Sequence, residues 1–223
     1  MTRLNIFIDE TGEFGFNKNS AKLYGVSMVF HEQKHSISKE MQRLNQCLKL
    51  LDFNNMIHMG DLVAGHGDYT GMSIAERRKI YQKLYRFATT IRAKYHTILI
   101  YTHYYRNNKL LSKAITVELN KMINSNLNYF LSFDHIKVYY DGGQKPLNRI
   151  ITDTFLTFDN TIQQSDFNHV EKKLFQVADM LTYVDKIIYK YNKRIRLTQT
   201  EKTFFSTKQI RMAINQLRPH RLE

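Results

Sequence analysis

The stretch Leu4-Asn5-Ile6-Phe7-Ile8-Asp9-Glu10-Thr11-Gly12 decides the fold of this chain. Its continuous apolar run is typical of a central strand that is buried on both faces. Asp9 and Glu10 follow at once, and a carboxylate at the end of a buried strand is unfavourable unless something compensates its charge. A bound cation is one such compensator, because hard divalent ions take carboxylate oxygens. The stretch alone leaves open the alternative that Asp9 only opens the turn at Gly12.

A second apolar strand ends in the same pattern. Residues 136–140 are followed by Asp141, Gly142 and Gly143, which repeats the order of strand, carboxylate and glycine. Two carboxylates at strand ends are harder to explain as simple turn residues than one. The repetition therefore favours a role for both carboxylates beyond turn formation.

Two predicted helices each carry an acid on or beside their apolar stripe. Glu118 falls at spacings of three and four from apolar residues of a helix over 109–131, so it either points with the stripe or reaches from its edge to water. Asp179 lies on the edge of the core-facing stripe of a helix over 172–191, with Gln176 on the same flank. We expect Asp179 to be half-buried beside hydrogen-bonding neighbours.

The order of the predicted elements indicates an α/β fold in one domain, residues 1–223. The predicted strands are 3–9, 22–30, 96–104, 136–140 and a short extended segment at 166–171. The predicted helices are 38–51, 74–93, 109–131, 146–160 and 172–191. With 31–94 taken as a helical insertion between strands two and three, this is the connectivity of the ribonuclease H-like fold, a central mixed five-stranded sheet flanked by helices. Residues 195–223 are expected to form a basic C-terminal extension.

Composition limits the classes of partner and of cellular location. The chain of 223 residues has a net charge of +13, from 33 Lys and Arg against 20 Asp and Glu, which favours a polyanionic partner. Trp is absent and no Lys-rich amphipathic helix stands out, so a membrane surface is not expected as that partner. No apolar run approaches about 20 residues and no signal peptide is recognised, so a cytoplasmic location is expected. The single Cys47 excludes an internal disulfide and a Cys-rich zinc site, and the oligomeric state stays open, a homodimer included.

Basic residues mixed with aromatic ones predict where nucleic acid binds. They gather at the end of the helix over 172–191 and just after it, an arrangement that suits a phosphate backbone with bases stacked nearby. The predicted nucleic-acid-binding residues are Lys186, Lys190, Tyr191, Lys193, Arg194 and Arg196.

The predicted acids suit phosphodiester hydrolysis in DNA or RNA. In a ribonuclease H-like fold the strand ends and flanking helices converge, and carboxylates there can hold two Mg²⁺ or Mn²⁺ ions about 4 Å apart, one activating water and one stabilising the leaving oxygen. The expected metal ligands are Asp9, Glu118, Asp141 and Asp179, with Glu10 as the alternative fourth carboxylate. Gln176 and His58 complete the predicted catalytic set. His58 lies in an irregular loop over 53–72, and it either positions substrate or water or only holds the loop.

The chain resembles the domain of unknown function 3800 family of bacteria and phages, which is taken to be ribonuclease H-like. The resemblance spans most of the chain. It is carried by residues 7–12 (Phe-Ile-Asp-Glu-Thr-Gly), Ile57-His58, residues 138–141 (Val-Tyr-Tyr-Asp) and residues 174–183 (Leu-Phe-Gln-Val-Ala-Asp-Met-Leu-Thr-Tyr). The family often has Glu two residues before the loop His, and here that position is Met56. The resemblance implies a metal-dependent nuclease and does not specify a substrate.

Other classes of protein fit less well. A phosphatase of the haloacid dehalogenase type needs a second Asp two residues after the first, and here that residue is Thr11. A P-loop enzyme is excluded because no Gly-x4-Gly-Lys-Ser/Thr run occurs. The alternative that stays open is a non-catalytic ribonuclease H-like module that binds nucleic acid or a protein.

Overall fold

β1, which carries the opening apolar run, lies at the centre of a mixed sheet. The computed structural model describes residues 1–14, 23–105, 107–158, 160–164 and 168–222. Within those residues the strands are β1 (Arg3–Thr11), β2 (Leu23–Glu32), β3 (Lys94–Tyr101), β4 (His135–Tyr139) and β5 (Thr161–Gln164). Their order is β3-β2-β1-β4-β5, with β2 antiparallel to both of its neighbours and β1, β4 and β5 mutually parallel. The predicted α/β class with a mixed five-stranded sheet is confirmed.

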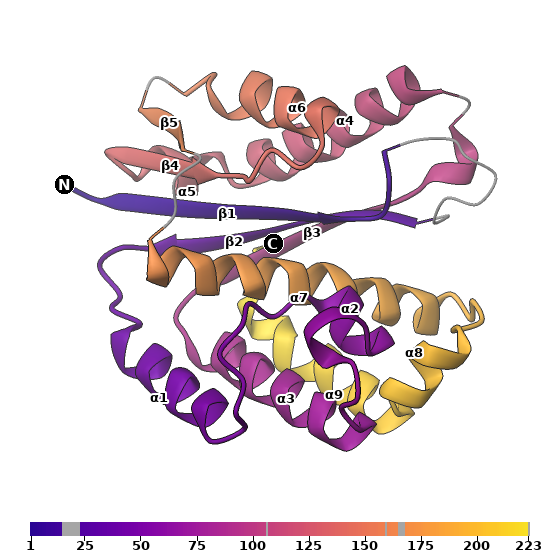
Figure 1. Cartoon of the computed structure of the whole chain (residues 1–223). Coiled ribbons are helices and arrows are strands. Elements are labelled where there is room, and N and C mark those ends of the chain that lie inside the picture. Colours follow the sequence, from indigo (N-terminus) through magenta and orange to yellow (C-terminus); the bar gives the residue numbers. More distant parts are fainter. Residues whose placement is uncertain (15–22, 106, 159, 165–167, 223) are drawn as a thin grey trace.

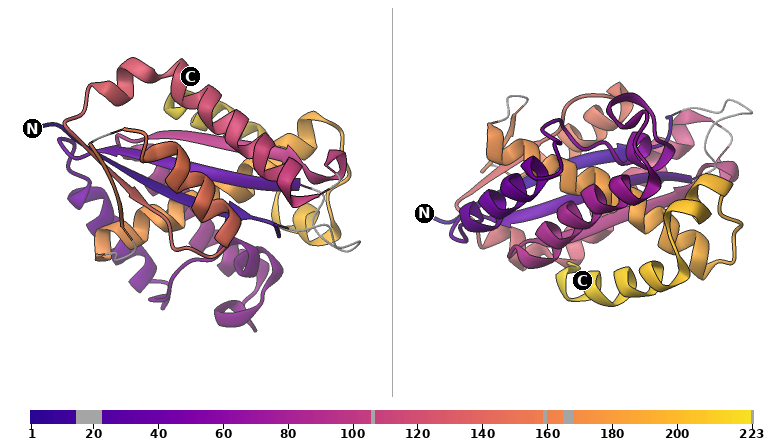
Figure 2. Two further views of the ribbon diagram at one scale, coloured as in Figure 1. Left: turned by 90° about the horizontal axis from the view of Figure 1, so that it is seen from above. Right: turned by 60° about the horizontal axis from the view of Figure 1, so that its bottom comes forward.

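Helices cover both faces of this sheet, so the molecule has three layers (Figure 1). One face carries α4 (Asn108–Ser125), α5 (Leu127–Leu131) and α6 (Lys145–Phe155), and α4 and α6 cross over the strands when seen from above (Figure 2). The other face carries α7 (His169–Asn192), α1 (Ser38–Lys49), α2 (Met59–Ala64), α3 (Ile74–Thr90), α8 (Gln199–Phe204) and α9 (Thr207–Leu217). Short 3₁₀ turns occur at Gly67–Tyr69, Thr102–Tyr104 and Arg218–His220. No helix among the described residues combines the length and the apolar character that crossing a membrane requires.

The alternation of side chains along β1 directs them into two separate cores. Ile6 and Ile8 belong to the core that packs under α4 and α6, whereas Phe7 belongs to the core under α7. Successive side chains of a strand point to opposite faces. Asp9 therefore lies on the face that α7 covers, and Glu10 lies on the opposite face.

α7 can approach the sheet closely because β2 has a glycine beneath it. A Cβ atom on Gly25 would lie only 2.9 Å from Leu99 Cδ2 and 2.9 Å from Thr182 Cγ2, so any side chain there would push α7 outward. Thr182 is fully buried on α7, one turn after Ala178. This contact sets the height above the sheet of Asp179, which lies between them on the same helix.

The predicted basic C-terminal extension, residues 195–223, contributes buried side chains to the core. In its described part it forms α8, α9 and a 3₁₀ turn. Its buried apolar side chains include Phe204, Phe205, Ile210 and Leu217. Two ion pairs join it to α7, and they are Lys190–Glu201, with 2.6 Å between Nζ and Oε1, and Arg221–Asp185.

Three local predictions were wrong. The loop over 53–72 contains α2, which ends at Gly65 with a φ of 80°. The helix over 109–131 breaks at Asn126, whose side-chain amide donates to the Met122 carbonyl oxygen and competes with the helical bonds. The extended segment over 166–171 is not found among the described residues there. The strand is β5, further upstream, and α7 begins directly after the capping box of Asn168; residues 165–167 lie outside the described part.

Candidate active site

Three aromatic rings pack together between α7 and the face of the sheet that α7 covers. The rings of Phe7 on β1 and Tyr139 on β4 stack with 4.8 Å between centroids and 6° between planes. The ring of Phe175 on α7 meets Phe7 edge-on at 5.7 Å. A predicted acid follows each ring on the same face, two residues later on the strands and four residues later on the helix. The packing of these rings therefore fixes the positions of the backbone segments that carry the three acids.

Asp9 and Asp141 occupy equivalent positions at the ends of two neighbouring parallel strands. The β1–β4 pairing ends at Phe7 and Tyr139, and each acid lies two residues beyond its paired ring. Asp141 Oδ1 also accepts a hydrogen bond from the Gly143 amide at 3.0 Å. Asp141 thus forms a turn as well, so turn formation and a place in the acidic cluster are compatible.

Asp179 is held from the opposite side by the start of α2. The Met59 amide donates to Asp179 Oδ2 at 2.8 Å. Burial raises the pKa of Asp179 to about 6, while the Met59 hydrogen bond and the charges of His58 and Lys186 act in the opposite direction. Asp179 is half-buried, as predicted.

A buried arginine fixes the other end of α2. Arg77 Nη1 donates to the carbonyl oxygens of Leu62 and Val63 at 2.8 and 2.7 Å. These carbonyls belong to the last turn of α2, where a cation complements the helix dipole. Arg77 therefore helps to orient the helix whose first amide binds Asp179.

The three acids line one pocket of about 190 Å³. Its polar lining is Asp9, His58, Asp141, Lys172, Gln176 and Asp179, and its apolar lining is Met56, Ile57 and Phe175. The predicted residues His58 and Gln176 are thus brought to the predicted acids. His58 and Lys172 are exposed at the rim, where Lys172 contributes a positive charge, whereas Gln176 is buried and accepts from Lys173 Nζ at 3.4 Å.

The acids of the pocket act on one another electrostatically. Burial raises the pKa of Asp9 well above its ordinary value, and the charges of Asp179, Glu10 and Asp141 raise it further. As placed, no three His, Cys, Asp or Glu side chains among the described residues are close enough together to hold one metal ion. The donor type suits a hard divalent cation, and binding one requires the side chains to turn toward one another.

Glu10 joins the cluster from the far face of the sheet. Burial raises its pKa to about 7, and a hydrogen bond with the Tyr140 hydroxyl opposes that shift. Its Oε2 atom is buried without a hydrogen-bond partner. A Cβ atom on Gly143 would lie 3.2 Å from Glu10 Oε1 and 3.4 Å from Asp141 Oδ1, so Gly143 leaves room for both carboxylates.

Gln144, which precedes α6, connects the strands around Glu10. Its backbone N–H donates to the Tyr140 hydroxyl at 2.9 Å, and its side-chain Nε2 atom donates to the Gly12 carbonyl oxygen at 2.8 Å. Its Oε1 atom accepts from the Tyr24 hydroxyl at 3.1 Å. These hydrogen bonds connect the ends of β1, β2 and β4 next to the Glu10 side chain.

Of the two orientations left open for Glu118, the structure has the one that reaches water. Its side chain is exposed on α4, and its charge acts on His96 of β3. It stands at the edge of the buried arc of the helix, from which a long charged side chain reaches water. Of the two alternatives for the fourth carboxylate, the structure places Glu10 with the other acids and Glu118 apart from them.

Some of the predicted nucleic-acid-binding residues interact with other side chains of the protein, and the rest are exposed to solvent. Lys190 is engaged with the buried Glu201. Lys186 Nζ lies 4.0 Å from the centroid of the Tyr183 ring, and the Tyr191 hydroxyl accepts from Arg211 Nε at 3.0 Å. The exposed cations are Lys193, Arg194 and Arg196.

Sequence reasoning missed Lys172, the Met59 amide and the Gln144 network. Lys172 had a usable signal, because it precedes Gln176 by four and Asp179 by seven residues and so shares their helix face. The Met59 amide and the network depend on tertiary contacts that no local spacing indicates.

A scan against protein-family models, a search of curated proteins and a search of solved structures each returned no match. The resemblance to the domain of unknown function 3800 family stays a prediction from the sequence.

Proposed function

We propose that this chain is a metal-dependent nuclease with a ribonuclease H-like fold, which hydrolyses phosphodiester bonds in DNA or RNA. The observation that supports this most strongly is the convergence of Asp9, Asp141 and Asp179 on one pocket. These residues would hold Mg²⁺ or Mn²⁺, with Glu10 as the fourth carboxylate. The strand order β3-β2-β1-β4-β5, in which β2 alone runs antiparallel to the other strands, supports the fold assignment.

The residues present fit a divalent cation by two criteria. Carboxylate oxygens are the ligands that such ions prefer, and the acids of this pocket repel one another without a cation. Glu10 Oε2 is buried without a hydrogen-bond partner, and a buried unsatisfied polar atom is unfavourable. A cation that Glu10 reached would satisfy that atom.

The chain's own groups would position the reacting atoms. Bound divalent cations supply activation of water and stabilisation of the leaving oxygen. Asp9 and Asp141 extend from rigid strand ends, and the Met59 amide orients the carboxylate of Asp179. The positive charge of Lys172 at the rim would attract a phosphate group to the pocket, and His58 lies beside it as a hydrogen-bonding group.

Metal-dependent stability and cleavage test the proposal together. Thermal unfolding of the full chain is followed during Mg²⁺ and Mn²⁺ titration, and labelled single- and double-stranded DNA and RNA are assayed for cleavage. We expect the metal to raise the unfolding temperature by mass action, and Asp141→Asn to lose both that gain and the cleavage. Asp153→Asn, on the exposed face of α6, removes an equal charge and should behave as wild type.

The alternative function is a non-catalytic module that binds nucleic acid or protein. The observation that favours it is that, as placed, the described acids do not form a closed metal site. Nucleic-acid binding without any metal-dependent gain in stability would support the module and overturn the nuclease. Cleavage that Asp141→Asn left unchanged would also overturn the proposed site.

A further inference from the structure

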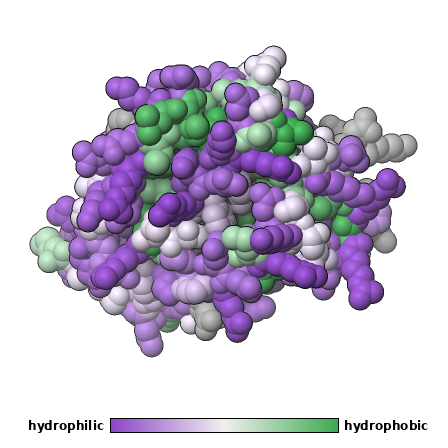
Figure 3. All heavy atoms as spheres, turned by 90° about the horizontal axis from the view of Figure 1, so that it is seen from below, coloured by the Kyte–Doolittle hydropathy of each residue, from purple (hydrophilic) through white to green (hydrophobic). Residues whose placement is uncertain are grey.

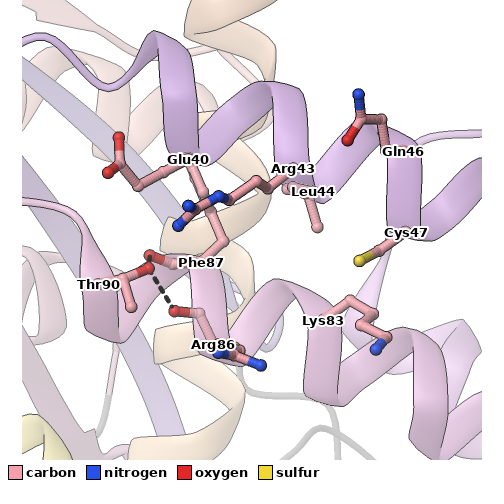
Figure 4. Close-up of a pocket in the computed structure, with 9 residues that line it drawn as sticks. All are labelled: Glu40, Arg43, Leu44, Gln46, Cys47, Lys83, Arg86, Phe87 and Thr90. Carbon is pink, nitrogen blue, oxygen red and sulfur yellow. Dashed lines mark hydrogen bonds between the residues drawn. The ribbon is translucent and has the colours of Figure 1, made fainter.

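A basic hollow lies between α1 and α3, away from the acidic pocket (Figure 4). It encloses about 380 Å³. Its lining is Glu40, Arg43, Leu44, Gln46 and Cys47 from α1 and Lys83, Arg86, Phe87 and Thr90 from α3. We call these residues the α1–α3 groove. It shares no lining residue with the acidic pocket.

Three cations of the α1–α3 groove lack a carboxylate partner. Among the described residues, no ion pair involves Arg43, Lys83 or Arg86, and their side chains make no hydrogen bond there. Glu40 is the single acid in the lining. Arg43 and Arg86 are exposed and Lys83 is half-buried, so the positive charge is available to a ligand.

The spread of this charge indicates an extended anion. Lys79, Lys83 and Arg86 follow one face of α3 over seven residues, which is about 10 Å at the rise of an α-helix. A single small anion would meet only part of this row, whereas a polyanion can meet all of it. Leu44 and Phe87 form the buried apolar floor beneath these cations.

The character of the surrounding surface argues against an apolar partner. Seen from below, the layer that contains α1 and α3 presents mostly hydrophilic side chains, with apolar patches between them (Figure 3). Protein interfaces are depleted of charged residues at their centre. We propose that the α1–α3 groove binds the sugar-phosphate backbone of a nucleic acid, at a distance from the bond that is cleaved. The choice of nucleic acid as the polyanion rests on the proposed function.

Cys47 allows the groove to be tested without any substitution, because it is the single cysteine of the chain. It is partly exposed in the groove. The rate of its alkylation by a maleimide is measured at low salt with EDTA, with and without single- and double-stranded DNA and RNA of defined length. We expect nucleic acid to slow the alkylation. Equal protection by poly-glutamate would overturn the proposal in favour of an acidic protein partner.

Charge variants give an independent measurement by fluorescence anisotropy. Arg43→Gln, Lys83→Gln and Arg86→Gln together should weaken binding and lower the slope of log affinity against log salt by about 2–3. Glu40→Gln should tighten binding, because it removes the opposing charge. The matched control is the triple change Lys109→Gln, Lys113→Gln and Lys121→Gln on exposed positions of α4 in the opposite layer.

The outcomes separate this inference from the nuclease proposal. An unchanged salt slope in the groove variant, an equal loss in the α4 control, or no binding by wild type at low salt would each overturn the groove. Binding to the groove is measured in EDTA, where neither metal binding nor cleavage contributes. A failure of metal response or cleavage would therefore concern the acidic pocket alone.

Discussion

The stacked rings of Phe7 and Tyr139 place Asp9 and Asp141 at the same height on adjacent parallel strands. The two rings are buried and their planes are nearly parallel, and they extend from strands whose register is fixed by backbone pairing. The two carboxylates consequently extend from a rigid base. Geometry of that kind is what a cation site needs, because ligands that are already oriented lose little freedom on binding.

The identity of the fourth carboxylate can be tested with two equal substitutions. Glu10→Gln should raise the Mn²⁺ concentration needed for thermal stabilisation by about tenfold or more, because Glu10 stands beside Asp141 at Gly143. Glu118→Gln should leave it unchanged, because Glu118 is exposed on α4. Metal titrations followed by differential scanning fluorimetry make the comparison. A larger effect at Glu118 would contradict the placement of both residues.

Gly143 gives a test of the space between the carboxylates. Gly143→Ala adds a methyl group 3.2 Å from Glu10 Oε1, so we expect weaker metal binding while the unfolding free energy changes by only about 1 kcal/mol. Gly60→Ala is the control, because a Cβ atom there meets nothing within 4 Å. Chemical denaturation and metal titration of both variants separate the two quantities. Identical metal responses in both variants would show that the site does not use this space.

The stability of the metal-free chain should depend on pH through its buried acids. The folded-state pKa values of Asp179 and Glu10, about 6 and about 7, lie above the ordinary values of 3.8 and 4.5. Between those ranges the folded state binds more protons than the unfolded state, so stability falls as the pH rises from about 4 to about 7. It stays low above that range unless a cation binds.

Asp9→Asn isolates this contribution from the other titrating groups. The substitution removes one of the repelling charges, so the metal-free variant should be more stable than wild type at about pH 8 and should lose less stability between about pH 5 and pH 8. Urea unfolding in EDTA at both pH values measures the difference. Parallel pH profiles for the two proteins would show that the acids do not interact.

Lys190 and Glu201 form an ion pair, and we expect the replacement of either residue alone to lower the free energy of unfolding. The Glu201 side chain is only 5% exposed, so Lys190→Met should destabilise the chain by about 3–5 kcal/mol. Combining Lys190→Met with Glu201→Met should recover most of that loss, because no unpaired charge stays buried. A double-mutant cycle by chemical denaturation checks this. If the single change proved harmless, Lys190 would be available for nucleic acid as first predicted.

The carboxylates at the ends of β1 and β4 are the part of the candidate site that the sequence could predict. An apolar run of β-type residues followed by an acid and a glycine fixes both the face and the end of a strand, so Asp9 and Asp141 were found from local pattern. Asp179 followed from helical spacing. The parallel pairing of β1 with β4, which brings the first two acids together, had to be supplied by the order of the elements along the chain.

Glu118 and the segment 195–223 show where local pattern was insufficient. Helical spacing placed Glu118 within about one residue of the buried face of α4. The width of that buried face depends on how closely α4 packs against its neighbours. The basic charge of 195–223 indicated a basic extension and did not indicate how it packs. Its burial depends on Phe204 and Phe205 meeting Tyr81 of α3, a contact between residues more than one hundred positions apart.

The three acids of the pocket come from the beginning, the middle and the late part of the chain. Joining such remote segments requires closure of long loops, which happens only as the whole sheet and its covering helix assemble. No fragment that lacks α7, and no partly folded intermediate with β1 and β4 unpaired, can possess the pocket. Under the proposed function, a copy that lacks α7, or in which β1 and β4 are unpaired, would not cleave nucleic acid.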